Sequence, residues 1–333
     1  MTETLNAALY RDAGVFALER ERIFAASWQL LGHENELGEP GAYLAATIAG
    51  YPVMAVRGED GILRAFHNVC RHRAGPLVED GTGACAGALT CRYHGWRYGL
   101  DGRLTSARDF GPAAGFDARQ FGLVEIACST WRGFVFVAMD KAAGPLEAVV
   151  APLQRRAREM DFFEGGRILR SAHEIACNWK TYVENYLEGY HVPIVHPALS
   201  ASLGNSYRVE IDGFLQFHQA GARPGAAVTG LWGWMWPCLG INLYADAVLM
   251  ERMWPAGPAR TRLEYLYVFR PGAGEDAIAR AKAASEVTTR EDIAICEAVQ
   301  RNLDAGIYRT GVLSPRHEQG LVWFQDEIRK VLA

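Results

Sequence analysis

The chain has 333 residues, 50% of them hydrophobic, and carries a formal net charge of −4. This length suits one large domain or two ordinary domains with a substantial core. The mildly acidic balance and the lack of a basic run argue against a nucleic-acid partner or a membrane surface. Because the first residues do not read as a secretory signal and no apolar stretch could span a bilayer, we expect a cytoplasmic protein.

The seven cysteines are spread thinly, and their number is odd. Disulfide frameworks belong to small, cysteine-dense secreted domains. In a reducing compartment, cysteines that stand beside histidines more often bind metal. The cysteine pattern therefore predicts metal centres rather than disulfides.

The first half of the chain reads as a helix followed by short strands. Residues 12–29 have the pattern of an amphipathic helix, and we expect the whole segment 1–39 to pack on the C-terminal domain. Short β runs cut by glycine and proline predict a small all-β domain over 40–145. These runs include residues 43–48, 52–56 and 133–137. A helical stretch over 146–161 is the expected linker region.

The second half, residues 146–333, predicts a different architecture. A helical pattern covers 178–190, and two further helices are expected at 274–303 and 319–332. The candidate strands between them are residues 207–217, 241–253 and 261–269. Strands followed by helices, without strict alternation, indicate an α+β domain built on an antiparallel sheet.

Two Cys–His pairs stand in the predicted β domain, first as C-x-H and then as C-x-x-H. The four residues are Cys70, His72, Cys91 and His94. A [2Fe–2S] cluster with two thiolates on one iron and two imidazoles on the other needs this mixture of ligands. Replacing thiolates by neutral imidazoles makes such a cluster easier to reduce. The pattern therefore predicts an electron relay bound by these four residues.

A structural zinc site is the alternative for the same residues. Zinc fingers usually have the order Cys, Cys, His, His, whereas here the two residue types alternate. Cys85 lies between the pairs and fits neither of them. The glycine-containing run 81–83 lacks the third glycine of a dinucleotide-binding fingerprint.

The segments CRHR and CRYHGWRYGLDGRL, which begin at Cys70 and Cys91, resemble the Rieske domain of ring-hydroxylating oxygenase α-subunits. The resemblance continues nearly to the C-terminus. It implies a Rieske domain over 40–145 and a catalytic domain of the helix-grip, START-like kind over 146–333. It also implies a mononuclear Fe(II) and an enzyme that uses O₂ to oxidise a small organic molecule.

The segment NWKTYVENYLEGYHVPIVHP offers two imidazoles for that iron, His191 and His196. Glu184, Glu188 and His191 are spaced to share one helical face, and Pro193 is expected to end that helix so that His196 curls back. Two imidazoles and one carboxylate form a facial triad that leaves room for O₂ and substrate. Two nearby histidines alone are more often ordinary residues, but an electron relay upstream needs a destination.

The carboxylate ligand is expected on the helix 274–303. Asp292 shares a face there with apolar residues, and a carboxylate on an apolar stripe must find a partner or a metal. The apolar residues of that face are Ile295, Cys296 and Val299. The segment EDIAICEAVQ also resembles the family's carboxylate-bearing stretch. Glu286 and Glu297 are alternative ligands, Glu291 is expected to face solvent, and a helix cap or ion pair is the ordinary role for Asp292.

The resemblance gives Glu188 a specific role. Many family members have Asp at this position, three residues before the first ligand histidine, where it links an iron ligand to a cluster histidine of the neighbouring subunit. The resemblance therefore implies that Glu188 joins His191 of one chain to His94 of another. The working unit would then be a ring, most simply a homotrimer. The alternative is an ordinary charged residue on a helix face.

A glutamate at this position resembles the branch of the family that acts on choline, glycine betaine and carnitine. Trp232, Trp234 and Trp236 alternate and would share a strand face, and aromatic faces attract quaternary ammonium groups. A core face or subunit interface is the alternative for these tryptophans. Hydroxylation or O-demethylation of an aromatic substrate is the alternative reaction.

The sequence contains no nicotinamide or flavin motif. The electrons are therefore expected from a separate NAD(P)H-dependent reductase with flavin and iron–sulfur centres. A pure Rieske electron carrier and a zinc-stabilised binding protein are the competing classes of protein. A carrier would not need the second half of the chain. Iron content separates these classes, because the oxygenase would bind about three irons per chain and the carrier about two.

Overall fold

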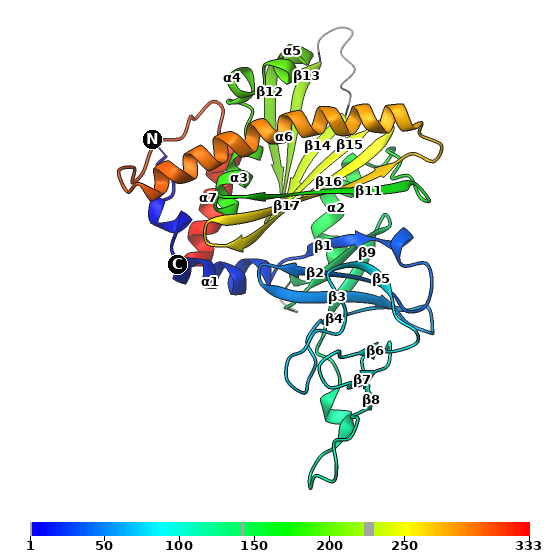
Figure 1. Ribbon diagram of the computed structural model, residues 1–333. Helices are drawn as coiled ribbons and strands as arrows, with labels where there is room; N and C mark the ends of the chain where they lie inside the picture. Colours follow the sequence, from blue (N-terminus) through cyan, green and yellow to red (C-terminus); the bar gives the residue numbers. More distant parts are fainter. Residues whose placement is uncertain (1, 141–142, 223–229) are drawn as a thin grey trace. The chain divides into compact units, whose positions relative to one another are not determined.

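A computed structural model describes residues 2–140, 143–222 and 230–333 (Figure 1). The chain divides into two compact units. The first comprises residues 24–148, and the second combines residues 1–23 with 149–333. Helices and antiparallel sheets together confirm the predicted α+β class.

The N-terminal segment is shared between the two units, and the boundary expected after residue 39 lies earlier. β1 (Gln29–His33) pairs with β10 (Phe134–Ala138) and so belongs to the first unit. The helix expected before it is also shorter than predicted. α1 (Ala13–Glu19) passes into one π-helical turn, Arg20–Phe24, and the chain then becomes extended.

The first unit is built from β-strands, as predicted. Its other strands are β2 (Ala42–Ile48), β3 (Tyr51–Arg57), β4 (Leu63–His67), β5 (Gly81–Ala84), β6 (Leu89–Thr90), β7 (Arg97–Tyr98), β8 (Leu104–Ser106) and β9 (Glu125–Trp131). They form one sheet of order β1-β10-β9-β4-β3-β2-β5 and a small sheet of order β6-β7-β8. Four consecutive residues of β3, 53–56, are fully buried, which shows that this strand is covered on both faces.

The second unit contains one seven-stranded antiparallel sheet of order β11-β17-β16-β15-β14-β13-β12. The strands are β11 (Arg167–Ile175), β12 (Leu203–Asp212), β13 (Leu215–Ala222), β14 (Gly230–Met235), β15 (Leu239–Tyr244), β16 (Ala247–Gly257) and β17 (Arg260–Phe269). Two runs predicted as single strands are hairpins instead. Gly213, with a φ of 63°, turns the chain between β12 and β13, and a second turn separates β15 from β16.

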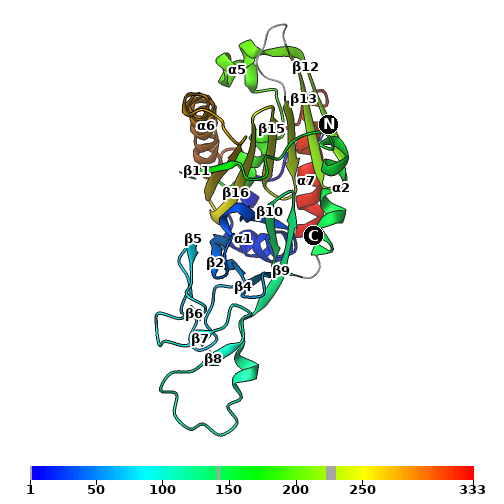
Figure 2. The same cartoon turned by 90° about the vertical axis from the view of Figure 1, so that its right-hand side faces the viewer.

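The helices of the second half are α2 (Leu146–Arg156), α3 (Trp179–Tyr186), α4 (Val192–Val195), α5 (Pro197–Ser202), α6 (Glu275–Asp304) and α7 (Gln319–Leu332). The two C-terminal helices match their predicted ranges closely. α6 lies across the sheet (Figure 1), and α7 lies beside β12 (Figure 2). In the described part of the chain, no helix is long and apolar enough to cross a membrane.

The strand register identifies the sheet face that these helices cover. One row of residues across the sheet consists of Gln216, Trp234, Gly240, Glu251 and Tyr265. Neighbouring residues in such a row point to the same side of the sheet. α3 reaches this row through Tyr182, α6 through Thr289 and α7 through Phe324. The three helices therefore pack on one face, which we call the helix-covered face.

Candidate active site

Two loops of similar shape carry the cluster candidates. The first follows β4, and the second joins β6 to β7. In each loop, the amide four positions after the cysteine donates to the cysteine carbonyl, from Ala74 to Cys70 and from Gly95 to Cys91. Ala74 and Gly95 have φ angles of 56° and 73°, so both loops turn back tightly at the same position. The repeated turn presents each Cys–His pair from one short loop.

The four side chains meet in a way that fits a [2Fe–2S] cluster. The rings of His72 and His94 have centroids 4.5 Å apart, and Cys70 and Cys91 are both buried in the same core cluster. A Cβ at Gly75 would lie 2.8 Å from Sγ of Cys91, so the loops approach as closely as glycine allows. Nδ1 of His72 is buried without a hydrogen-bond partner among the described residues, as expected of a ring nitrogen that faces a metal.

Aromatic residues surround this group. The Trp96 indole stacks on the His72 ring at 4.8 Å between centroids. The Tyr98 hydroxyl lies 3.2 Å from Sγ of Cys70 and is also the acceptor for the Arg71 amide. A hydrogen bond to a ligand sulfur is one means by which a protein raises the potential of a cluster.

The three candidates for the mononuclear iron also come together, within the second unit. Nε2 of His196 lies 2.8 Å from Oδ1 of Asp292, and Nε2 of His191 lies 3.6 Å from the same oxygen. One ligand atom from each residue lies within 4.8 Å of the other two. Two imidazoles and a carboxylate at this separation fit a facial triad for Fe(II).

The backbone around the two histidines differs from the prediction. α3 ends at Tyr186, because the Glu188 carboxylate accepts hydrogen bonds from the amides of Tyr190 and His191 and holds the chain in a turn. Pro193 lies in the first turn of α4 rather than at the end of a helix, a position that suits its missing N–H. The predicted helical face through Glu188 and His191 is therefore wrong, although the two side chains still meet.

Each histidine has a carboxylate on its other ring nitrogen. Nδ1 of His191 lies 2.5 Å from Glu188, and Nδ1 of His196 lies 2.7 Å from Glu291. Such partners fix which nitrogen faces a metal. Burial lowers the pKa of His196, but hydrogen bonds to Asp292 and Glu291 outweigh it and raise the pKa above the ordinary value. Glu291 was expected to face solvent, and this prediction is wrong because α6 brings it against His196.

Asp292 is held from α3. The Asn185 amide donates to Oδ1 of Asp292 over 2.6 Å. The alternative ligands are engaged elsewhere, since Glu286 pairs with Arg290 and Glu297 accepts the Ala176 amide. The structure thus brings only Asp292, of these three carboxylates in the described residues, against both histidines.

The apolar stripe predicted beside Asp292 is only partly buried. Cys296 is buried, but Ile295 is 39% exposed and Val299 is 41% exposed. The Asp292 side chain itself is 14% exposed. Its place near the histidines follows from the contact of α6 with α3 and α4 rather than from a buried stripe.

A buried carboxyl that the sequence did not single out joins the same two helices. Glu251 accepts hydrogen bonds of 3.1 Å from the hydroxyls of Tyr182 in α3 and Tyr265 in β17, and the Tyr265 hydroxyl also contacts Thr289 in α6 at 2.8 Å. Burial, and then the charge of Asp292, raise the pKa of Glu251 to about 8. Tyr182 lies one helical turn before Asn185 in α3, and Thr289 lies one helical turn before Asp292 in α6.

The three tryptophans do not form one cage. Trp234 and Trp236 are buried against aromatic residues of α7, so the core-face alternative is right for these two. Trp232 lies one row further along the helix-covered face, and its indole N–H donates to the Tyr244 hydroxyl over 3.3 Å.

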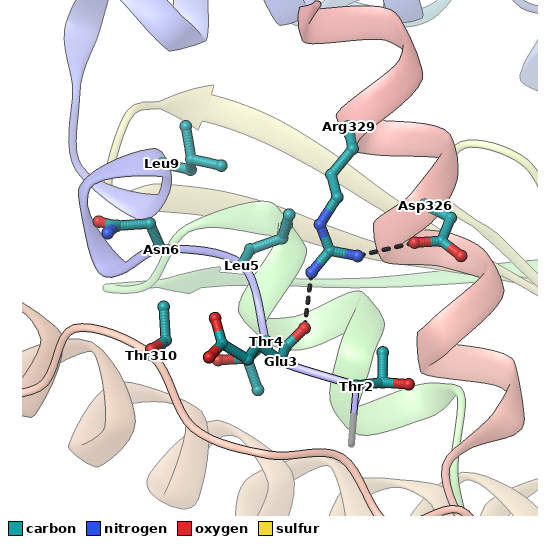
Figure 3. A pocket seen from close by; sticks show the side chains of 9 residues that line it. All are labelled: Thr2, Glu3, Thr4, Leu5, Asn6, Leu9, Thr310, Asp326 and Arg329. Atoms are coloured by element: carbon teal, nitrogen blue, oxygen red, sulfur yellow. Dashed lines mark hydrogen bonds and ion pairs between the residues drawn. The ribbon is translucent and has the colours of Figure 1, made fainter.

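A separate hollow of about 550 Å³ lies near the N-terminus (Figure 3). Its Arg329 guanidinium donates to Asp326 over 2.8 Å and to the carbonyl of Glu3 over 2.6 Å. The Arg329 guanidinium is already engaged, and none of the proposed cluster or iron ligands lines the hollow, so the hollow is not part of the site described above.

Comparison with known families decides the identity of the chain. The Rieske [2Fe-2S] domain family matches residues 27–117. The family of the ring hydroxylating alpha subunit (catalytic domain) matches residues 163–234 and 218–333. The chain belongs to the ring-hydroxylating oxygenase α-subunit family. This oxygenase therefore uses a [2Fe–2S] cluster and a mononuclear iron, which confirms the predicted family, enzyme class and cofactors.

Named relatives of this oxygenase cover most of its length. The carnitine monooxygenase oxygenase subunit of Escherichia coli K12 is 31% identical over 92% of the chain and 86% of that protein. The chloroplastic choline monooxygenase of Spinacia oleracea is 27% identical over 97% of the chain and 77% of that protein. A crystal structure of a quaternary ammonium Rieske monooxygenase with L-carnitine is 27% identical, with a TM-score of 0.88 over 99% of the chain and 96% of that protein.

Proposed function

We propose that this chain is the terminal oxygenase of a multicomponent system that oxidises a quaternary ammonium compound. The observation that carries the proposal is the likeness, over nearly the whole chain, to oxygenase subunits named for carnitine and choline. The aromatic side chains of Trp232 and Tyr244 on the helix-covered face support it, because aromatic faces attract such cations by about 0.5–2 kcal/mol per ring.

The proposed ligands of the [2Fe–2S] cluster are Cys70, His72, Cys91 and His94. The proposed ligands of Fe(II) are His191, His196 and Asp292. When bound, the cluster supplies electrons one at a time and the iron activates O₂. The chain's own groups hold the ligands in place: Glu188 and Glu291 orient the imidazoles and Asn185 holds the carboxylate.

The proposed reaction is a monooxygenation. One oxygen atom of O₂ enters the substrate and the other leaves as water, with two electrons and two protons consumed. We propose that the electrons come from a separate NAD(P)H-dependent reductase with flavin and iron–sulfur centres. The name "oxygenase subunit" of the E. coli relative supports a system with a further component.

We also propose that the working assembly is a homotrimer in which Glu188 links His191 to His94 of the partner subunit. Within the second unit, Tyr190 beside Glu188 is 58% exposed. Within the first unit, Tyr93 beside His94 is 55% exposed. Exposed aromatic side chains next to both proposed ends of the link favour coverage by another chain. We propose a cytoplasmic location, which the lack of disulfides among the seven cysteines supports. We propose no nucleic-acid or membrane partner, because the net charge is −4 and the sequence has no basic run.

A substrate panel tests the proposed function. The loaded protein is supplied with a flavin-dependent, iron–sulfur-containing reductase, NADH and O₂. Choline, glycine betaine and carnitine are compared with benzoate and methoxybenzoate. Substrate-dependent O₂ uptake with a quaternary ammonium compound is expected. Coupled turnover of the aromatic acids alone would contradict the proposed substrate class and favour ring hydroxylation or O-demethylation.

A further inference from the structure

One buried histidine near the iron site is not used by either metal centre. His218 of β13 is 4% exposed and lies opposite Trp232 of β14, on the helix-covered face. Its ring centroid is 5.9 Å from that of Tyr186, the last residue of α3. The imidazole therefore lies between the aromatic strand residues and the helix that leads into the iron-binding segment.

The Tyr207 hydroxyl fixes the chemical form of this imidazole. The hydroxyl oxygen lies 2.6 Å from Nδ1 of His218. Among the described residues, the Tyr207 hydroxyl has no other hydrogen-bond partner. Burial raises the pKa of Tyr207, and burial lowers the pKa of His218 to about 4. The hydroxyl therefore keeps its proton, and the ring is neutral. The hydroxyl donates the hydrogen bond to Nδ1, because the other tautomer would leave both the hydroxyl hydrogen and Nε2 without a partner among the described residues. A neutral imidazole that accepts at Nδ1 carries its hydrogen on Nε2.

The Nε2 atom of His218 is a donor without an acceptor. It is buried and has no hydrogen-bond partner within the described ranges. Unpaired buried donors are rare because the lost hydrogen bond to water is not replaced. The Tyr186 ring packs at 77° to the imidazole, and Trp232 lies opposite His218 on the neighbouring strand.

The position of this donor is tied to the iron-binding segment. A Cβ at Gly189 would lie 2.8 Å from the Tyr207 ring, so the backbone between Glu188 and His191 packs directly on the residue that orients His218. A substrate group that binds the imidazole is thereby placed at a fixed position relative to that segment.

We propose that His218 is a specificity-determining residue whose Nε2–H donates to an oxygen of the substrate. The inference rests on the proposed function and narrows it, since the substrate would be a quaternary ammonium compound that also carries a carboxylate or hydroxyl group. The N–H binds the oxygen end, and the aromatic faces of Trp232 and Tyr244 suit the cationic end. Together they select the carbon that meets the iron.

Two matched variants and two matched ligands test this role. His218→Asn places a carbonyl near the Nδ1 position, which keeps an acceptor for Tyr207 but removes the distal donor. His218→Gln instead retains an N–H near the Nε2 position. Calorimetry with the cluster- and iron-loaded protein, without reductant, measures the binding of γ-butyrobetaine and of butyltrimethylammonium, which lacks the carboxylate.

The wild type should prefer γ-butyrobetaine. His218→Asn should weaken that ligand by about 10- to 100-fold and leave butyltrimethylammonium unchanged, while His218→Gln should lose much less. An equal loss for both ligands, no loss for either, or a wild type without preference would overturn the inference. Should His218→Asn fail to fold, Tyr207→Phe carries the test, because the loss of the orienting hydroxyl should also weaken γ-butyrobetaine selectively, and an unchanged preference would overturn the role.

Failure of the proposed function has a different signature. The wild type would then bind neither quaternary ammonium ligand. In that case, the same calorimetry compares benzoate with toluene, which lacks the carboxylate. A preference for benzoate that His218→Asn abolishes would support the His218 donor while contradicting the substrate class. A preference that survives in His218→Asn would overturn the donor role as well.

Discussion

The amide of Asn185 in α3 donates a hydrogen bond of 2.6 Å to the carboxylate of Asp292 in α6. These residues are 107 positions apart in the chain, and the contact holds the acidic member of the proposed triad against His191 and His196. One turn earlier in each helix, Tyr182 of α3 and Thr289 of α6 are joined through Glu251 of β16 and the Tyr265 hydroxyl. The carboxylate is thus fixed by two connections between α3 and α6.

Removing a proposed iron ligand should empty one metal centre and spare the other. Asp292→Ala and His191→Ala should each bind about two irons per chain rather than about three, lose turnover and keep the visible spectrum of the cluster. Metal analysis with absorption spectroscopy measures both. Glu297→Ala is the matched control on the same helix. If Glu297→Ala lost the third iron while Asp292→Ala kept it, the assignment of the carboxylate would be wrong.

The Glu251 connection should affect iron affinity more than stability. Glu251→Leu removes the acceptor of two tyrosine hydroxyls and with it one link between α3 and α6, so the iron dissociation constant should rise about 10-fold. The melting temperature should change little, because burying a carboxyl is itself costly. Glu251→Gln keeps an acceptor and should restore most of the affinity. A competition titration with a chelator checks this, and wild-type iron affinity in Glu251→Leu would show that the link does not position Asp292.

The cluster assignment makes a prediction about colour. Cys91→Ala should lose the red-brown absorption of a [2Fe–2S] centre, because the iron loses one of two thiolates. Cys85→Ala, in the same unit, is the control and should keep it. A colourless wild type that contains zinc would instead favour the structural zinc site.

A partly buried acid should make stability depend on pH. Burial raises the pKa of Glu184 from 4.5 to about 7, while hydrogen bonds from Tyr10 and Gln325 act against this shift. The protonated form is therefore favoured in the folded state, so its stabilising effect is full below pH 4.5 and is lost as the pH rises through 7. Glu184→Gln should be more stable than the wild type by about 3 kcal/mol at pH 8 and similar to it near pH 4.5.

Chemical denaturation at the two pH values measures this difference. Glu21→Gln, at an exposed position, serves as the control and should not alter the pH dependence. Parallel pH profiles of the wild type and Glu184→Gln would contradict the raised pKa.

The features that sequence predicted well are local ones. The Cys–His pairs are set by spacing within two loops, and α6 and α7 by long amphipathic patterns. The hairpin at Gly213 was missed because β runs on both sides of a two-residue turn read as one strand. Asn185, Glu251 and Glu291 could not be found, since their roles depend on contacts between helices and strands far apart in the chain, as in the 95-residue separation of Glu291 from His196.

Glu188 is the residue that couples the proposed mechanism to the proposed homotrimer. Glu188→Gln keeps the size of the side chain but loses its charge, so at least one imidazole hydrogen bond weakens. Both metal centres should remain loaded and the oligomer intact, while reoxidation of the reduced cluster by substrate and O₂ slows greatly. Stopped-flow absorption and gel filtration measure the two properties. Reoxidation at the wild-type rate, or an active monomer, would refute the link between subunits.

The most direct measurement of the central claim is a single turnover of fully loaded, pre-reduced wild-type protein with ¹⁸O₂ and each quaternary ammonium compound. We predict reoxidation of the cluster that depends on the substrate, together with one labelled oxygen atom transferred to the product. Reoxidation without any labelled product from every compound in the series would contradict the proposal that this chain is a quaternary ammonium monooxygenase.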